Sequence, residues 1–281
     1  MWHIDGERRH PYGAISPDPA WSGPIGFPPP WPDRPWIFGV MVASANGVVA
    51  WRRRDAADDP VRGVLGGDDT RPERIADRRL MRLLRCYGDV GIGAQTLREQ
   101  PGLVQTPQEP GEPPVPGLYA FRAALGLSHH PRTIVYSLLG RLPLTNPVFH
   151  TPGLEVLVVT SEAGAAELAR RDSVTPAPLA LVVEPLPAPA ALRRAHERLH
   201  AEHGVRYIAC EGSMTVLHAL RDAGLLDEVF VTTTDATVES SAHEGVLTIF
   251  DFDREGARLV GEGRVAPDSR WLFRRWRFSE R

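Results

Sequence analysis

Short apolar runs alternate along this chain with longer segments in which apolar residues recur every three or four positions. Runs of five to eight residues, rich in valine and isoleucine and bounded by turn residues, are typical of buried strands. Ala76, Leu80, Leu83, Leu84 and Tyr87 instead share one face of a helix. The alternation predicts an α/β fold with a mostly parallel sheet covered by helices on both faces. The expected strands are 36–43, 89–93, 133–137, 155–160, 179–184, 205–210 and 228–233, and the expected helices are 75–87, 162–171, 188–203 and 213–223.

Two late segments, 257–265 and 270–278, have strand character and no helix between them, so they predict an antiparallel hairpin at an edge of the sheet. The second mixes arginines with aromatic residues, as stacking on nucleic acid can require, but its near alternation favours a core strand or a dimer contact. Nine prolines fall in residues 1–35. We therefore expect a proline-rich arm over 1–33, which wraps around the domain, covers a partner subunit or stays loose, and one domain over 34–281.

Composition excludes several function classes. The net charge of -3 argues against a protein that gains its affinity by neutralising nucleic-acid phosphates. All 32 basic residues are arginine, so no lysine can form a Schiff base or a P-loop. Cys86 and Cys210 are too few for a disulfide framework and predict two reduced thiols. No apolar run approaches the roughly 20 residues that span a bilayer, and the first residues lack a signal-peptide pattern, so we expect a cytoplasmic protein without membrane contact.

Two turns carry candidate chemistry. The strand at 89–93 runs into Gly93 and then a short helix, and the strand at 205–210 runs into Glu211 and Gly212 and then a helix. Helix N-termini reached through glycine turns present backbone N–H groups to phosphates. Each turn alone is equally well explained by glycine's backbone freedom. Two such turns in one sheet favour a nucleotide, although the third glycine of a dinucleotide-binding fingerprint is missing.

Five ordered motifs resemble the reductase domain of riboflavin biosynthesis, the C-terminal domain of bifunctional deaminase-reductases. The segment 43–50 resembles the family's S-L-D-G-x-I-A, 76–79 leads a helix, and 93–98 is similar to G-A-G-T-V-R. The segments 211–213 and 223–228 resemble E-G-G and A-G-L-V-D-E. The resemblance covers most of the chain from about Arg34 to Phe278. It implies a dihydrofolate-reductase-like fold, a homodimer, NADPH as cofactor, and reduction of the ribosylamino group of a pyrimidine phosphate.

The resemblance also implies roles for individual residues. Glu211 is expected to be catalytic, as an orienting group or as an acid through water, with Asp77 as the second candidate and Asn46 beside them. Ser44, Asn46 and Glu211 would contact the substrate. A helix or turn cap is an equally good explanation of the serines at 137 and 161. The expected cofactor-binding residues are Gly93, Ala94, Thr96, Ser137, Arg141, Thr160, Ser161, Gly212, Ser213 and Met214.

The chain departs from the family pattern at four ligand-facing places. Asn46 stands where the family has aspartate, Val48 where many members have lysine, and Ser213 where E-G-G has its second glycine. The threonines and aspartate at 232–235 replace the usual proline. These changes leave open a second function, a paralogue that binds a nucleotide or related small molecule without turnover.

A third possibility comes from His196-Glu197-Arg198-Leu199-His200, which matches the H-E-x-x-H pattern of zinc hydrolases. The pattern falls on a helix whose buried stripe is expected to leave both histidines at the border with solvent. Because no motif supplies a third ligand, a solvated helix face is the favoured interpretation and no metal is expected.

Overall fold

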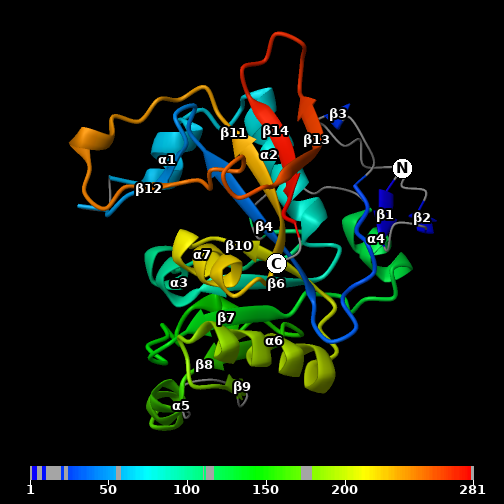
Figure 1. Cartoon of the computed structure of the whole chain (residues 1–281), viewed down its shortest axis with the longest axis vertical. Coiled ribbons are helices and arrows are strands. Elements are labelled where there is room, and N and C mark those ends of the chain that lie inside the picture. Colours follow the sequence, from blue (N-terminus) through cyan, green and yellow to red (C-terminus); the bar gives the residue numbers. More distant parts are fainter. Residues whose placement is uncertain are drawn as a thin grey trace.

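The computed structural model describes residues 2–4, 8–10, 20–21, 25–54, 58–109, 111, 117–171 and 179–279. Its centre is a ten-stranded sheet in the order β3-β13-β14-β11-β4-β10-β6-β7-β8-β9 (Figure 1). Seven adjacent strands, from β11 to β9 in this order, run parallel. They are β4 (Trp36–Ala43), β6 (Asp89–Gly93), β7 (Thr133–Ser137), β8 (Val156–Thr160), β9 (Ala180–Val183), β10 (Tyr207–Glu211) and β11 (Leu226–Thr233).

The C-terminal hairpin lies where the sequence predicts it. Strands β13 (Arg258–Arg264) and β14 (Leu272–Arg277) pair antiparallel, and β14 joins them to β11. The two-residue strand β3 (Ala20–Trp21) adds to the outer side of β13. Trp271 and Phe273 beside and within β14 are fully buried, so this segment belongs to the core. Two small sheets pair β1 (Trp2–Ile4) with β2 (Arg8–His10) and β5 (Val48–Ala50) with β12 (Leu247–Thr248).

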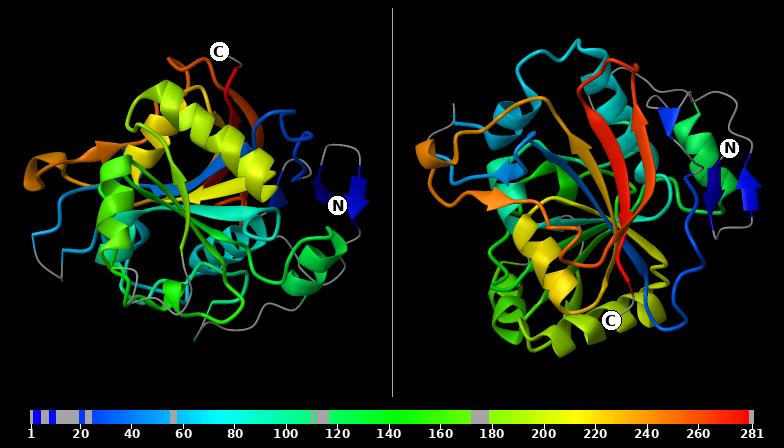
Figure 2. Two further views of the ribbon diagram at one scale, coloured as in Figure 1. Left: turned by 90° about the horizontal axis from the view of Figure 1, so that it is seen from below. Right: turned by 45° about the horizontal axis from the view of Figure 1, so that its top comes forward.

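Helices cover both faces of the sheet, as Figure 2 shows from below. One face packs against α6 (Pro189–His203) and α7 (Met214–Asp222), through residues such as Leu199 and Leu217. The other face packs against α2 (Pro72–Leu84) and α4 (Leu118–Ala124) at one end and against α3 (Ala94–Glu99) and α5 (Glu162–Ala169) at the other. The predicted α/β class is therefore confirmed. The remaining helices are α1 (Pro60–Leu65) and the 3-10 turns Pro147–Phe149 and Ser240–Ala242.

Element boundaries follow local chemistry. The helix expected over 75–87 begins earlier, at Pro72, because proline suits the first helical turn, where its missing N–H is not needed. It ends at Leu84, and Arg85 forms its C-cap. Helix α6 ends at Gly204, whose φ of 63° is the left-handed cap conformation expected from the sequence.

Part of the proline-rich segment packs on the domain. Ile25 and Phe27 are buried in the core beneath α2. The Arg275 guanidinium lies 4.8 Å from the centre of the Phe27 ring and donates a hydrogen bond to the Gly26 carbonyl. Trp31 Nε1 donates to Asp227. These contacts join residues 25–31 to β11 and β14.

Both cysteines are free and buried. Burial raises the pKa of the Cys86 thiol to about 12, so it stays protonated and unreactive. Within the described residues, no helix has the length and apolar character needed to cross a membrane.

Candidate active site

The two predicted turns lie side by side. Strands β6 and β10 are parallel neighbours with Gly91 opposite Cys210, so their carboxyl ends meet at one edge of the sheet. A Cβ on Gly93 would lie 3.0 Å from the Ser213 Cβ, and a Cβ on Gly212 would lie 3.4 Å from Thr96 Oγ1. Ligands of open α/β sheets bind at the carboxyl ends of the strands. The geometry therefore brings the candidate residues of both turns to one place.

The turn before α7 has an unusual backbone. Gly212 has φ of 103°, and Ser213, with φ of 61°, is the single non-glycine residue with positive φ in the described ranges. Such a conformation costs a side-chain-bearing residue on the order of 1–3 kcal/mol. Ser213 makes no side-chain capping bond, and α7 has no acidic residue in its first turn. The first backbone N–H groups of α7 thus lack a side-chain cap, and Met214, the first residue of the helix, is buried.

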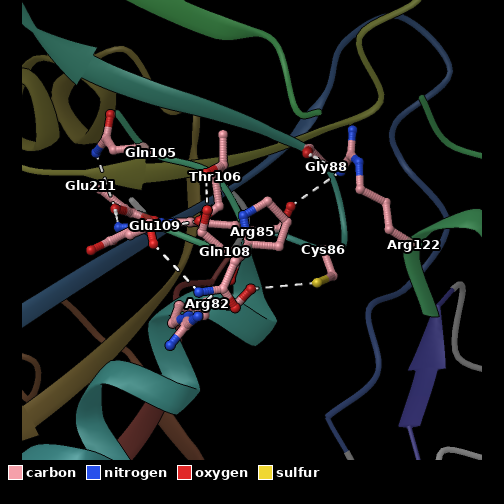
Figure 3. A network of polar contacts seen from close by, with 11 residues as sticks. Arg82, Arg85, Cys86, Gly88, Gln105, Thr106, Gln108, Glu109, Arg122 and Glu211 are labelled. Carbon is pink, nitrogen blue, oxygen red and sulfur yellow. Dashed lines mark hydrogen bonds and ion pairs between the residues drawn. The ribbon is translucent and has the colours of Figure 1, made fainter. Parts of the chain in front are cut away.

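Glu211 is held by a buried arginine (Figure 3). Arg85 Nε donates to Glu211 Oε1 at 2.5 Å, and Arg85 Nη2 donates to Oε2 at 2.6 Å. Gln105 Nε2 donates to the same Oε2 at 3.0 Å. The two-point pair with a guanidinium, together with Gln105, fixes the orientation of the Glu211 carboxyl group. The geometry of Glu211 therefore suits an orienting group.

Arg85 also fixes the segment that follows α3. Its Nη1 donates to the Thr106 carbonyl at 3.0 Å and pairs with Glu109. Neither Arg85 nor Gln105 is among the site residues expected from the sequence. The sequence could have indicated Arg85, because it lies at the end of the apolar face of a predicted helix, and a cation buried there needs an anion as its partner. No signal identifies Gln105, which lies 106 positions from Glu211.

Asp77 is the second buried carboxyl group of the site. It is 4% exposed and accepts a hydrogen bond from Thr232 on β11. Burial raises the pKa of Asp77, the Thr232 hydrogen bond and nearby Arg74 and Arg78 oppose the rise, and the charge of Glu211 adds to it. Asp77 and Glu211 thus interact electrostatically, and the raised pKa of Asp77 makes it the candidate acid of the pair.

Ser44 and Asn46 hold a loop. Ser44 is fully buried, its hydroxyl donates to Asn46 Oδ1 at 2.8 Å, and it accepts from the Val48 N–H. Asn46 Nδ2 donates to the Val238 carbonyl, and Asn46 Oδ1 accepts from the Val238 N–H. The Asn46 amide therefore joins the loop after β4 to the segment after β11. Contact of Ser44 and Asn46 with substrate stays a prediction.

Four of the expected cofactor-binding residues lie at or just after the ends of β7 and β8: Ser137, Arg141, Thr160 and Ser161. Thr160 is fully buried and its hydroxyl donates to the Ser137 carbonyl at 2.6 Å. Ser161 accepts from the Gly164 N–H as the N-cap of α5, in agreement with the capping interpretation. Ser137 is buried, and Arg141 is exposed at the turn that follows. Of this group, Arg141 presents the charge that a phosphate would need.

The buried position of His196 corrects an expectation. It is fully buried, whereas the sequence placed both histidines of H-E-x-x-H at the border with solvent. Its Nδ1 lies 2.8 Å from the Leu192 carbonyl and its Nε2 lies 2.9 Å from the Tyr136 hydroxyl. Burial lowers the pKa of His196 to about 4. Both ring nitrogens are therefore engaged, and the zinc alternative lacks an available first ligand.

A cavity of about 450 Å³ lies elsewhere, between α1 and residues 237–243. Trp51, Asp58 and His243 contribute to its lining. None of the residues predicted to bind substrate or cofactor lines it. It therefore does not enlarge the candidate site.

Comparison with known proteins finds no matching family model and no matching curated protein. Among solved structures, a pyrimidine reductase-like protein from Corynebacterium diphtheriae has a TM-score of 0.62 and 21% identity, over 89% of this chain and 94% of that chain. The riboflavin biosynthesis reductase Rib7 from Saccharomyces cerevisiae has a TM-score of 0.53 and 12% identity, over 88% of this chain and 90% of that one.

A third similar structure is a diaminohydroxyphosphoribosylaminopyrimidine deaminase/5-amino-6-(5-phosphoribosylamino)uracil reductase from Thermotoga maritima. It has a TM-score of 0.55 and 15% identity over 88% of this chain. This chain spans 57% of the length of that protein. The likenesses confirm the fold expected from the sequence motifs.

Proposed function

We propose that the protein is an NADPH-dependent reductase acting on a pyrimidine ribosylamino phosphate or a closely related heterocycle. The observation that carries the proposal is the contact between the turns at Gly93 and Gly212, with Glu211 on the second turn and the buried carboxyl group of Asp77 near enough to interact electrostatically with Glu211. The fold shared with pyrimidine reductases supports the substrate class. A homodimer remains a prediction.

The residues present fit a dinucleotide. Gly212, with φ of 103°, allows the backbone of the turn before α7 to approach a ligand closely, whereas a Cβ on Gly93 would meet Ser213 of this chain, so a pyrophosphate would contact the turn at Gly212. The N-terminus of α7, a helix of nine residues, offers uncapped N–H groups and the positive end of its dipole. Ala94 and Thr96 would border the nicotinamide half, and the exposed Arg141 would pair with the 2′-phosphate.

In this arrangement the bound cofactor supplies hydride to a carbon of the substrate, and the chain must supply a proton and hold the reacting atoms together. Asp77 suits the proton transfer because burial keeps its carboxyl group protonated above the usual range. It would donate to the oxygen or nitrogen bonded to the carbon that accepts hydride. Glu211, fixed by Arg85, would accept a hydrogen bond from the substrate and orient it.

The test is loss of NADPH absorbance when the protein is mixed with 5-amino-6-(5-phosphoribosylamino)uracil, the compound in the name of the Thermotoga maritima reductase. We expect turnover that depends on both compounds. NADPH that binds but is never oxidised, with this and related pyrimidines, would contradict the proposal.

That outcome would instead support the second candidate, a nucleotide-binding protein without turnover. The feature that favours this candidate is Ser213, which stands where the E-G-G motif has its second glycine. Its side chain, at positive φ, lies against Gly93. The side chain narrows the space between the two turns. The two candidates differ in oxidation of NADPH, not in its binding.

A further inference from the structure

The segment after α3 covers Glu211 and brings Gln105 into the site. Gln105 is 3% exposed and Thr106 is 2% exposed, so both are nearly enclosed. Arg85 holds the segment through the Thr106 carbonyl and Glu109 while it holds Glu211 with its other nitrogens. One guanidinium therefore sets the position of Gln105 relative to the turn at Glu211.

The orientation of the Gln105 carboxamide follows from its neighbour. A carboxylate only accepts hydrogen bonds, so the amide nitrogen, and not the amide oxygen, must face Glu211. The Nε2 to Oε2 distance of 3.0 Å agrees with this arrangement. Figure 3 shows the amide oxygen of Gln105 directed away from Glu211. Among the described residues, the bond to Glu211 is the one hydrogen bond of this side chain.

The part of the Gln105 carboxamide that is not bonded to Glu211 offers a hydrogen-bond donor and an acceptor. A carboxamide nitrogen carries two hydrogens, and one is used by Glu211. The second hydrogen and the carbonyl oxygen form an adjacent donor and acceptor. The Gln105 amide oxygen is not one of the fully buried side-chain atoms that lack a partner in the described residues, so this edge reaches solvent, where a ligand can pair with it.

We propose that Gln105 selects the heterocycle by pairing with a lactam edge, an N–H beside a C=O, such as the imide of a uracil ring. The amide oxygen accepts from the ring N–H, and the amide N–H donates to the ring carbonyl. This inference rests on the proposed pyrimidine reductase function and names the group that reads its substrate. Glu211 and Arg85 act on specificity through Gln105 as positioning residues.

Binding, rather than turnover, tests the inference. Calorimetry would compare 5-amino-6-(5-phosphoribosylamino)uracil with its analogue methylated at the ring imide nitrogen, each on the full chain. Wild type should bind the unmethylated compound at least tenfold more tightly, since the methyl group removes the ring N–H that the amide oxygen accepts and its bulk moves the neighbouring carbonyl away from the amide N–H. Gln105→Met, similar in volume but without the amide, should lose this discrimination.

Gln100→Met is the matched control, because Gln100 is exposed on the same connection. It should keep the wild-type discrimination. NADPH affinity, measured by fluorescence, should be unchanged in both variants and shows that they are folded.

The outcomes separate this inference from the proposed function. If Gln105→Met still discriminates between the two compounds, or if wild type binds both equally, the role of Gln105 is refuted while the reductase proposal stands. If wild type binds neither compound, both the lactam contact and the pyrimidine substrate class are refuted, whereas NADPH binding alone would preserve the dinucleotide site.

Discussion

Gly93 and Ser213 are in close contact: a Cβ added to Gly93 would lie 3.0 Å from the Ser213 Cβ. Gly93 ends β6 and Ser213 is the N-cap that precedes α7, so this contact joins the two turns that we assign to the cofactor. The contact leaves no room for a larger residue at position 93. The space between the two turns holds one side chain, and in this protein it is that of Ser213.

Gly93→Ala should weaken NADPH binding at least tenfold, about 1.4 kcal/mol, because the added methyl group must displace Ser213 and the start of α7. A fluorescence titration with NADPH measures the effect. Gly102→Ala is the control, since no atom lies within 4 Å of the position its Cβ would take. Equal affinities for the two variants would remove the turn from the cofactor site.

The Arg85–Glu211 pair should behave as a buried, strongly coupled unit. Either Glu211→Gln or Arg85→Met alone leaves a buried charge with fewer partners and should cost about 3 kcal/mol of the free energy of unfolding. The double variant should cost less than the sum by about 2 kcal/mol. Denaturant unfolding measures all three.

The exposed pair Arg198–Glu202 provides the comparison, and its coupling should be much weaker than that of Arg85 and Glu211 because solvent screens both charges. Glu211→Gln should also abolish turnover and leave NADPH affinity largely intact. Additive stability effects for Arg85 and Glu211 would show that the pair does not orient the site.

Asp77→Asn should lower kcat by about 100-fold or more with little change in NADPH affinity, because the amide cannot donate the proton. Since burial raises the pKa of Asp77, wild-type kcat should be constant at low pH and fall as pH rises through that pKa. Thr232→Val removes a bond that lowers the pKa, so the fall should move to higher pH. An unchanged pH profile in both variants would assign the proton to another group.

His196 should make the fold sensitive to acid. Burial lowers the pKa of His196 from 6.5 to about 4, so its contribution to stability is complete above pH 6.5 and is lost as pH falls through about 4. The difference of 2.5 units corresponds to about 3 kcal/mol of the free energy of unfolding. Between pH 6.5 and about 4, the free energy of unfolding of the His196→Leu variant should fall less than that of wild type. Urea unfolding at several pH values measures both. If wild type and variant lose the same free energy of unfolding, groups other than His196 determine the acid transition.

Much of the fold could be predicted from the sequence because the parallel strands are buried on both faces. Such strands are nearly continuous apolar runs that end at glycine or serine, and β4, β6 and β7 have the predicted bounds. The contact between the turns at Gly93 and Glu211 also follows, since parallel strands bring their carboxyl ends to one edge.

Side-chain partners far apart in sequence could not be predicted. Spacing placed His196 near solvent, but Tyr136, 60 positions away, supplies a hydroxyl that satisfies the ring inside the core. Similarly, Arg85 and Glu211 are separated by 126 positions, and neither neighbourhood reveals the other. Periodicity reports which face of a helix is buried, whereas it does not report which polar groups the tertiary structure brings to that face.

The most direct test of the central claim is a crystal structure of the protein grown with saturating NADPH. We expect the pyrophosphate at the turn formed by Gly212, Ser213 and the start of α7, and the nicotinamide between Gly93 and Glu211. A dinucleotide bound at any other place, or none bound under conditions where related reductases are occupied, would contradict the account.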